Sequence, residues 1–237
     1  MKIGVGGCSH SSTGYGYPWH KFMGQRYSAK IIKSSTSGGG NEANVEKIKY
    51  IFDENPDLDF FVLQLTEPSR FVFGMEDFNN SHEKTDCVLD NPTFFNGVKY
   101  YTAVGNKNDE RLKKRTNIDV KFDQLFRNHI YISDYNTKYK FLHTLMSIQH
   151  LANHYNKKII FFSWFVDVRE LAQSVGYQHI IEKMIILEGY VMDFVKKNKI
   201  SPIPKDSHYD SDAHKIIFND YIHPQLKELI TITTKII

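Results

Sequence analysis

Residues 2–11, Lys-Ile-Gly-Val-Gly-Gly-Cys-Ser-His-Ser, begin as a short apolar run and end in glycines and small polar residues. This pattern predicts a buried strand over Lys2–Cys8 that terminates in a turn. In open parallel sheets the ligand crevice lies outside the carboxyl ends of the strands. The turn after this first strand, which contains Ser9, is therefore the first candidate position for a functional side chain.

Outward from this strand, helices alternate with further strands. Apolar residues recur at helical spacing over Pro18–Ser28 and again over Ala43–Phe52, which predicts two helices. Two apolar runs, Ala29–Lys33 and Leu58–Leu65, have the composition of strands buried in a parallel sheet. The order strand, helix, strand, helix, strand predicts an α/β fold, a three-layer α/β/α sandwich with a central parallel sheet of the flavodoxin-like kind.

The alternation breaks at about residues 68–133, which are polar, aromatic and irregular. A compact domain seldom carries so long a connection, so we expect one domain over residues 1–237 with an insertion that has local structure. The insertion is either a lid or substrate-binding element or a surface excursion without chemistry. The α/β pattern then resumes with a helix over Thr137–Tyr155, a strand over Lys158–Trp164, helical segments over Val168–Lys197, and a closing helix over Asp210–Ile222 that Pro224 should end or kink.

Charge and cysteine content limit the classes of partner. The chain carries 30 Lys+Arg and 27 Asp+Glu, a formal net charge of +3, which does not favour a dedicated nucleic-acid-binding protein. Two cysteines, Cys8 and Cys87, cannot form a disulfide framework or a thiolate metal cage. No stretch approaches the roughly 20 apolar residues of a membrane span, and no signal sequence is recognisable. We expect a cytoplasmic protein with no membrane association and no cofactor, and the sequence leaves its oligomeric state open.

A serine, a histidine and an aspartate stand at the ends of predicted elements. Serine is a poor nucleophile until a base takes its proton, and a carboxylate holds the ring of a histidine base in the right tautomer. Asp206 and His208, two residues apart on an extended segment, can place both side chains on one side of the chain. Together with Ser9 they could form such a set, although a turn serine and a polar surface turn are the structural alternatives.

Two further segments follow the second and third predicted strands. Gly38–Gly40 would let backbone amides approach a ligand closely, but the segment lacks the spacing of a nucleotide-binding loop. Thr66 and Arg70 lie in the polar stretch after the third strand. A flexible turn and a polar strand end are the alternatives for these segments. A metal site is a separate alternative, although the alternating spacing makes shared coordination difficult; its ligands would be Asp206, His208, Asp210, Asp212 and His214.

The order of these motifs resembles the SGNH (GDSL-like) hydrolase superfamily. That family has a nucleophilic serine after strand one, an oxyanion-hole glycine after strand two, an oxyanion-hole asparagine after strand three, and an Asp/His pair before the last helix. The resemblance implies that Ser9 is the nucleophile, with its own N–H in the oxyanion hole, and that Asp206 and His208 complete a triad. It assigns the oxyanion or substrate-binding positions to Gly39, Gly40, Thr66, Arg70 and His10.

The sequence is most similar to divergent members in tailed-phage genomes, which carry Gly-x-Ser-His-[Ser/Thr] and a Trp/Gln-x-Thr-x-x-x-Arg third motif. Three positions depart from the general family pattern. Cys8 replaces the usual aspartate before the nucleophile, Thr66 stands where the oxyanion asparagine is expected, and the Asp206–His208 spacing is one residue shorter than usual. That shorter spacing is similar to the O-acetyltransferase branches of the superfamily.

The resemblance implies a serine hydrolase that cleaves an ester, such as an acyl or acetyl ester on a carbohydrate. Two alternatives stay open. One is an O-acyltransferase of the same fold, and the other is a catalytically silent member that binds a glycan or a virion partner. For the hydrolase and the transferase the expected substrate is a small molecule or a carbohydrate ester, and no metal is required.

Overall fold

The computed structural model describes residues 1–11, 16–35, 40–68, 70–76, 94–95, 98–104, 134–204 and 208–234. For Ser9, the described residues of 70–104, Asp134 and residues 231–234, it describes the backbone alone.

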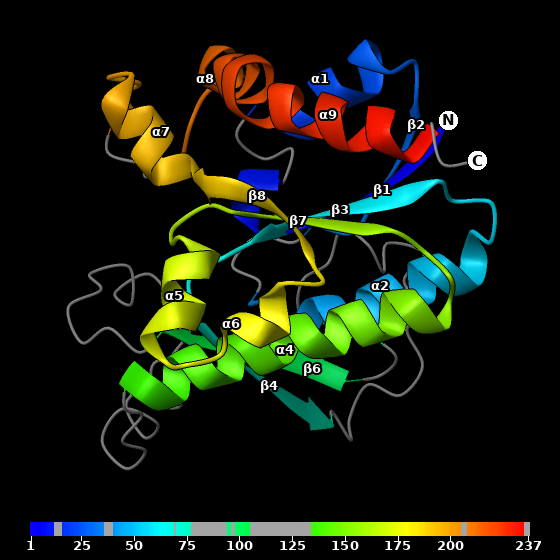
Figure 1. Ribbon diagram of the computed structural model, residues 1–237, viewed down its shortest axis with the longest axis vertical. Coiled ribbons are helices and arrows are strands. Elements are labelled where there is room, and N and C mark those ends of the chain that lie inside the picture. Colours follow the sequence, from blue (N-terminus) through cyan, green and yellow to red (C-terminus); the bar gives the residue numbers. More distant parts are fainter. Residues whose placement is uncertain are drawn as a thin grey trace.

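A five-stranded parallel sheet forms the middle layer of the molecule (Figure 1). Its strands run in the order β2-β1-β3-β7-β8, and every neighbouring pair is parallel. The prediction of an α/β/α sandwich with a central parallel sheet is confirmed. The strands are β1 (Lys2–Gly6), β2 (Lys30–Lys33), β3 (Phe60–Leu65), β7 (Ile159–Ser163) and β8 (Ile185–Tyr190).

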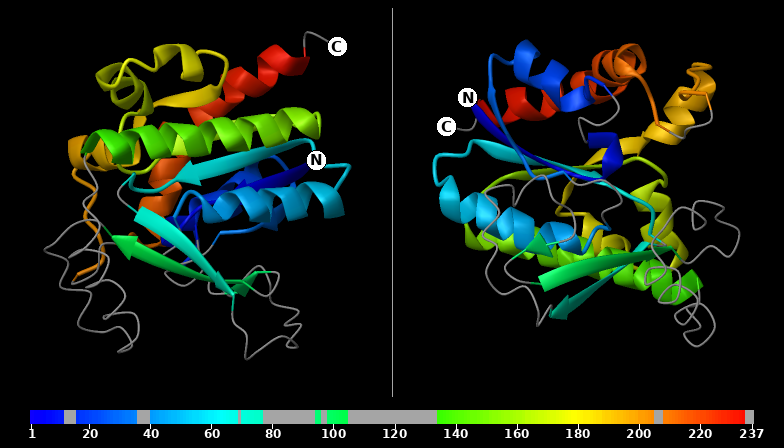
Figure 2. Two further views of the ribbon diagram at one scale, coloured as in Figure 1. Left: turned by 90° about the horizontal axis from the view of Figure 1, so that it is seen from below. Right: turned by 180° about the vertical axis from the view of Figure 1, so that it is seen from behind.

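Helices cover both faces of this sheet, as the two further views in Figure 2 show. The first layer consists of α2 (Ala43–Glu54), α4 (Asp134–His154), α5 (Val168–Ser174) and α6 (Gln178–Ile181). The opposite layer consists of α1 (Trp19–Arg26), α7 (Val191–Lys197), α8 (Ser211–Ile216), a π-helical segment (Ile217–Ile222) and α9 (His223–Thr234).

Strand β3 lies in the centre of the sheet and is buried on both faces. Phe61 and Leu63 pack in the cluster beneath α2 and α4, whereas Phe60 and Val62 pack in the cluster beneath α1 and α7. Successive side chains of a strand point to opposite faces, so an uninterrupted apolar run suits a strand covered on both sides. Gln64 is the one polar residue of β3, and it is also fully buried.

Helical segments were expected over Val168–Lys197, and α5, α6 and α7 lie there, but the expectation missed strand β8 between α6 and α7. It pairs with β7 in the register Ile160↔Ile185 and Phe161↔Ile186. A short apolar run such as Met184–Leu187 cannot be assigned to helix or strand from periodicity alone. Pairing with β7 makes this run a strand, since Ile186 then packs in one core cluster and Leu187 in the other.

Pro224 was expected to end or kink the closing helix, and it does not end it, because the chain continues as α9 to Thr234. The π-helical segment immediately before α9 gives the physical reason. An interior proline removes one hydrogen bond of an α-helix, and its ring collides with the carbonyl group four residues earlier. The wider turns of the π segment shift the backbone hydrogen-bond pairing just before Pro224, so the helix can continue past the proline.

Within residues 68–133 the described strands form a second sheet. It is antiparallel, in the order β4-β6-β5, and consists of β4 (Arg70–Glu76), β5 (Phe94–Phe95) and β6 (Val98–Val104). Much of the remaining segment lies outside the described residues.

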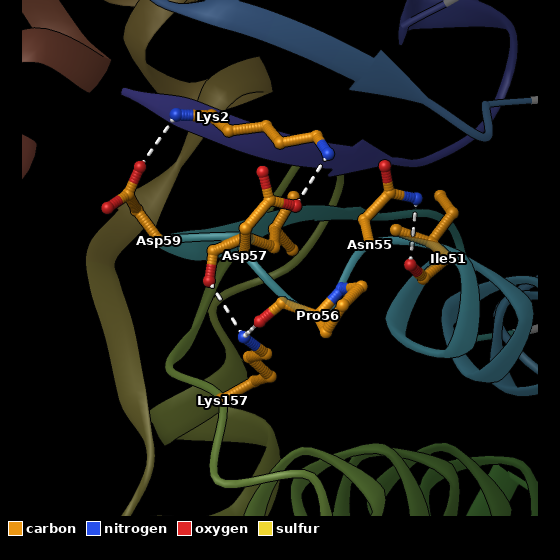
Figure 3. A network of polar contacts seen from close by, with 8 residues as sticks. Lys2, Ile51, Asn55, Pro56, Asp57, Asp59 and Lys157 are labelled. Atoms are coloured by element: carbon orange, nitrogen blue, oxygen red, sulfur yellow. Dashed lines mark hydrogen bonds and ion pairs between the residues drawn. The ribbon is translucent and has the colours of Figure 1, made fainter.

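Polar contacts fasten the amino-terminal edge of the parallel sheet (Figure 3). The backbone N–H of Lys2 donates to Asp59 at 2.6 Å, and its Nζ lies 2.6 Å from Asp57 Oδ1. From the other side, Lys157 Nζ donates to the carbonyl groups of Pro56 and Leu58. These contacts tie the start of β1 to the loop before β3 and leave the opposite, carboxyl edge to the loops that carry the candidate site.

Candidate functional site at the carboxyl edge of the sheet

Three predicted site segments follow neighbouring parallel strands and therefore share one edge of the sheet. Ser9 follows β1, Gly40 follows β2 and Thr66 follows β3. His208 reaches the same edge from the segment before α8, because its ring lies beside the ring of His10. The structure thus brings together segments that are up to about 200 residues apart in sequence.

The turn after β1 is tightly built. Gly7 has φ of +153°, and a Cβ at this position would lie 2.7 Å from Ser11 Oγ and 2.8 Å from Gln64 Oε1. Only glycine fits such a conformation and so close an approach. Ser9–Ser11 then forms one 3₁₀ turn, in which the Ser11 N–H donates to the Cys8 carbonyl at 2.9 Å. The Ser9 backbone occupies the first position of this turn.

Side chains from α1 and the β2 loop hold the far end of the turn. Trp19 Nε1 donates to Ser11 Oγ at 2.9 Å. The Ser11 carbonyl accepts from Ser35 Oγ at 2.6 Å and from His20 Nε2 at 2.9 Å. Trp19, His20 and Ser35 could not be assigned to the site from the sequence, because nothing local distinguishes them from ordinary helix and loop residues.

His20 makes stability dependent on pH. Burial lowers its pKa from 6.5 to about 4, so the ring stays neutral in the folded protein. Above pH 6.5 the ring is neutral in both states. As the pH falls from about 6.5 to about 4, the unfolded chain binds a proton that the folded protein does not, and the free energy of unfolding falls. The full difference amounts to about 3 kcal/mol.

Denaturant unfolding at pH 7 and pH 4.5 checks this prediction. We expect His20→Gln, whose amide can still donate to the Ser11 carbonyl, to reduce the loss of stability between these pH values by about 2 kcal/mol. His214, whose pKa burial also lowers to about 4, keeps its own contribution of the same sign. An unchanged difference between the two pH values in the variant would show that His20 is not the group responsible.

A group of aromatic rings encloses His10. The ring is 3% exposed and stacks on Trp164 with a centroid distance of 4.3 Å and an interplanar angle of 12°. The His208 ring lies 4.8 Å from it, and the rings of Phe165 and Tyr209 lie at 5.6 and 6.3 Å. Because His10 directly follows Ser9, these contacts place the His208 segment next to the turn after β1. Trp164, at the end of β7, is a site residue that the sequence analysis did not single out.

The segment around His208 is held by its own backbone and by a helix cap. The Ile203 N–H donates to the His208 carbonyl at 2.8 Å, which closes the loop that leads into α8. Asp210 caps α8 by accepting from the Ala213 N–H at 2.8 Å, a structural role that leaves it engaged at the helix start. Ser211 Oγ accepts from the Tyr17 N–H at 2.8 Å and joins this loop to the one before α1.

Thr66 is fixed by the residue that follows Gly40. Asn41 Oδ1 accepts from the Thr66 N–H at 2.9 Å, and Asn41 Nδ2 donates to the Thr66 carbonyl at 3.2 Å. This reciprocal pair uses the main-chain donor of Thr66. Its hydroxyl group, on a residue that is 1% exposed, has no hydrogen-bond partner within the part of the chain that the structure describes.

Some predicted positions lie outside this description. Asp206 and Gly39 fall in undescribed segments, and only the backbone is described for Arg70, the first residue of β4. Among the described side chains no group of three or more His, Cys, Asp or Glu is arranged to hold a metal ion. No helix of the described ranges is both long and apolar enough to cross a membrane.

Comparison with solved structures identifies the fold. The chain is similar to the psychrotrophic esterase EstA from Pseudoalteromonas sp., with a TM-score of 0.54 and 11% sequence identity over 97% of this chain and 98% of that chain. The five-stranded parallel sheet flanked by helices is thus the SGNH hydrolase fold. At this identity the similarity shows the fold alone.

Two other solved structures align over most of their length, with TM-scores below 0.5. One is a lipolytic protein of the G-D-S-L family from Veillonella parvula, with a TM-score of 0.48 and 11% identity over 98% of each chain. The other is AlinE4, an SGNH-hydrolase family esterase, with a TM-score of 0.44 and 14% identity over 99% of this chain and 93% of that chain. No protein-family model and no curated protein matches the sequence. The similarity to phage members stays a prediction from the sequence motifs.

Proposed function

We propose that the protein is a serine esterase in which Ser9, His208 and Asp206 act together. The observation that carries the proposal is the 4.8 Å distance between the rings of His208 and His10. It supports the triad because His10 adjoins Ser9, and a general base must come within hydrogen-bond reach of the hydroxyl group that it activates. The fold that the chain shares with the esterase EstA is a second, independent support.

In this mechanism the Ser9 oxygen attacks the ester carbonyl carbon while His208 takes the hydroxyl proton. His208 then gives the proton to the departing alcohol, and an acyl group is left on Ser9. His208 then takes a proton from water as the water oxygen attacks the acyl carbon, the bond between this carbon and Ser9 Oγ breaks, and His208 returns the proton to Ser9 Oγ as the carboxylic acid leaves. Asp206 holds the His208 ring in the required tautomer and stabilises its protonated form. Gly40 and Arg70 are the proposed substrate-binding residues, together with His10, whose ring lies against the base.

The oxyanion of the tetrahedral intermediate needs several hydrogen-bond donors. We assign this role to the backbone N–H groups of Ser9 and Gly39 and to the Thr66 hydroxyl. The Thr66 main chain already donates to Asn41, so a contribution from Thr66 has to come from its side chain. A buried hydroxyl group without a hydrogen-bond partner, as that of Thr66 is within the described part of the chain, lowers the stability of the folded protein. Donation to an oxyanion would explain why the protein keeps it.

Replacing Thr66 by the isosteric valine tests this assignment. We expect kcat for a short-chain aryl ester to fall roughly 100-fold or more, because one donor to the oxyanion is lost. Thr66→Ser keeps the hydroxyl group and should retain activity to within about tenfold. Full activity of Thr66→Val would exclude the side chain of Thr66 from the oxyanion hole.

The proposed substrate is an acyl or acetyl ester on a carbohydrate. The near-balanced charge of the chain suits a neutral substrate of this kind. The wild-type protein should hydrolyse 4-nitrophenyl acetate faster than the same protein after heat denaturation, and one equivalent of a fluorophosphonate should abolish the difference. Hydrolysis no faster than the denatured control would contradict the proposal, and binding of a glycan by that inert protein would favour the silent alternative.

Transfer to a sugar hydroxyl is the second candidate, favoured by the short spacing between Asp206 and His208. Both reactions pass through the same acyl group on Ser9 and differ in whether water or a sugar hydroxyl attacks it. Product analysis with an acetyl donor and an excess of a mixed oligosaccharide acceptor separates the two. A transferase yields acetylated sugar, whereas a hydrolase yields acetate at a rate that the sugar leaves unchanged.

A further inference from the structure

The carboxamide of Gln64 lies between the end of β3 and the turn that carries Ser9. We infer that Gln64 is a positioning residue for this turn and thereby sets the rate of the chemical step. The inference rests on the proposed function, since it assigns to Gln64 control over the proposed nucleophile. It also makes a structural claim about the turn that can be tested without any substrate.

The hydrogen bonds of Gln64 go mainly to the two residues that flank Ser9 and His10. Its Oε1 accepts from Ser11 Oγ at 2.9 Å and from the Cys8 N–H at 3.3 Å. Its Nε2 donates to the Leu65 carbonyl at 3.0 Å, and both side-chain atoms contact Cys8 Sγ at 3.3 and 3.5 Å. Gln64 Oε1 therefore holds the chain at the residue before Ser9 and again two residues after Ser9.

The sequence position makes a carboxamide unexpected here. Gln64 continues the face of β3 that Phe60 and Val62 present to the core, and its side chain is 0% exposed. Burying an amide is unfavourable unless its polar atoms find partners, so an apolar residue would be the ordinary choice. Apart from the Leu65 carbonyl, the partners of Gln64 belong to the turn, which gives the amide a role beyond filling space.

The neighbouring residues limit any other arrangement of this turn. Gly7 approaches so closely that an added Cβ would lie 2.8 Å from Gln64 Oε1. Ser11 Oγ, which donates to Gln64, itself accepts from Trp19 Nε1 at 2.9 Å, so the chain of hydrogen bonds ends on α1. Without Gln64, neither the Cys8 N–H nor the Ser11 hydroxyl keeps its acceptor, and the 3₁₀ turn is free to shift. A displacement of about 1 Å at a catalytic group can lower the rate about 100-fold.

The kinetic test replaces Gln64 by methionine, which has a similar length and no amide. We expect kcat for 4-nitrophenyl acetate to fall roughly 100-fold while KM changes less than about threefold, because substrate contacts remain. Ser11→Ala should also lower kcat, and the double variant should fall no further than the worse single variant. Gln64→Glu, buried and therefore protonated, keeps the carbonyl acceptor and should recover most of the lost rate.

Leu58→Ala is the matched control. Leu58 is 3% exposed and packs beside the amino-terminal end of β3, away from the turn. Its truncation lowers stability by leaving a cavity but should leave kcat unchanged. A fall in kcat in Leu58→Ala as large as that in Gln64→Met would mean that general destabilisation, and not positioning, explains the effect.

Cys8 reports on the turn without any catalysis. Its thiol is 1% exposed and contacts Gln64, so a thiol reagent should react with it slowly in a Cys87→Ser background. Adding Gln64→Met should raise that reaction rate at least about tenfold under conditions where the protein stays folded. A wild-type protein without esterase activity would overturn the proposed function. A Gln64→Met protein with wild-type kcat and a protected Cys8 thiol would overturn the inference alone.

Discussion

Replacing Ser9 with alanine should lower kcat for ester hydrolysis on the order of 10⁴-fold or more, because the acyl-enzyme can no longer form. The backbone of the 3₁₀ turn would persist in the variant, since its hydrogen bonds run through Cys8, Ser11 and Gln64. Substrate binding should therefore survive, and KM or a substrate dissociation constant should change little. Steady-state kinetics with 4-nitrophenyl acetate measure both parameters.

Ser147→Ala is the matched control for this loss. Ser147 is exposed on α4, where its hydroxyl donates to the His143 carbonyl, and it takes no part in the proposed site. It should hydrolyse the ester at the wild-type rate. A Ser9→Ala protein that retains more than about a tenth of wild-type kcat would show that another group carries the acyl intermediate.

Replacing His208 with alanine should cause a loss of similar size, because Ser9 then has no base to take its proton. The two losses should not multiply in the double variant, since the residues act as one unit. Imidazole added to His208→Ala can enter the space left by the ring and should restore part of the rate as its concentration rises. Neither effect is expected if His208 only packs against His10.

His150→Ala serves as the control, because His150 is exposed on α4 and remote from the turn after β1. Its kcat should equal that of the wild type, and added imidazole should leave it unchanged. A His208→Ala protein with near wild-type kcat would remove His208 from the mechanism, whatever the outcome for Ser9.

The fold was predictable where apolar patterns are local and unambiguous. The run that became β3, buried on both faces, has the composition of a central strand and stands where an alternating α/β order expects a strand. Strand β8 was not predictable, because Met184–Leu187 suits a buried helix as well, and only pairing with β7 decides between them. The continuation of the helix past Pro224 was not predictable for a related reason, since the π-helical segment that accommodates the proline has no sequence signature.

The candidate site was predictable to the level of segments. The rule that parallel strands end at one edge was enough to group Ser9, Gly40 and Thr66, and the nearness of His208 to His10 agrees with it. The contacts that shape the site were not predictable, because they join residues far apart in sequence. The Asn41–Thr66 pair spans 25 residues and the Gln64–Ser11 bond spans 53. The signals in the sequence were a polar residue, Gln64, in the otherwise apolar run of β3, and its place at the start of the Gln-x-Thr-x-x-x-Arg motif.

The most direct test of the proposed catalytic set is a crystal structure of the protein after reaction with a phosphonate ester inhibitor. The mechanism predicts a covalent bond between Ser9 Oγ and phosphorus, with an imidazole nitrogen of His208 within about 3.2 Å of Ser9 Oγ or of the phosphonate. Asp206 should accept a hydrogen bond from the other ring nitrogen. A phosphonate bound to a different residue, or a His208 ring too far from Ser9 for even one bridging water, would contradict the proposal.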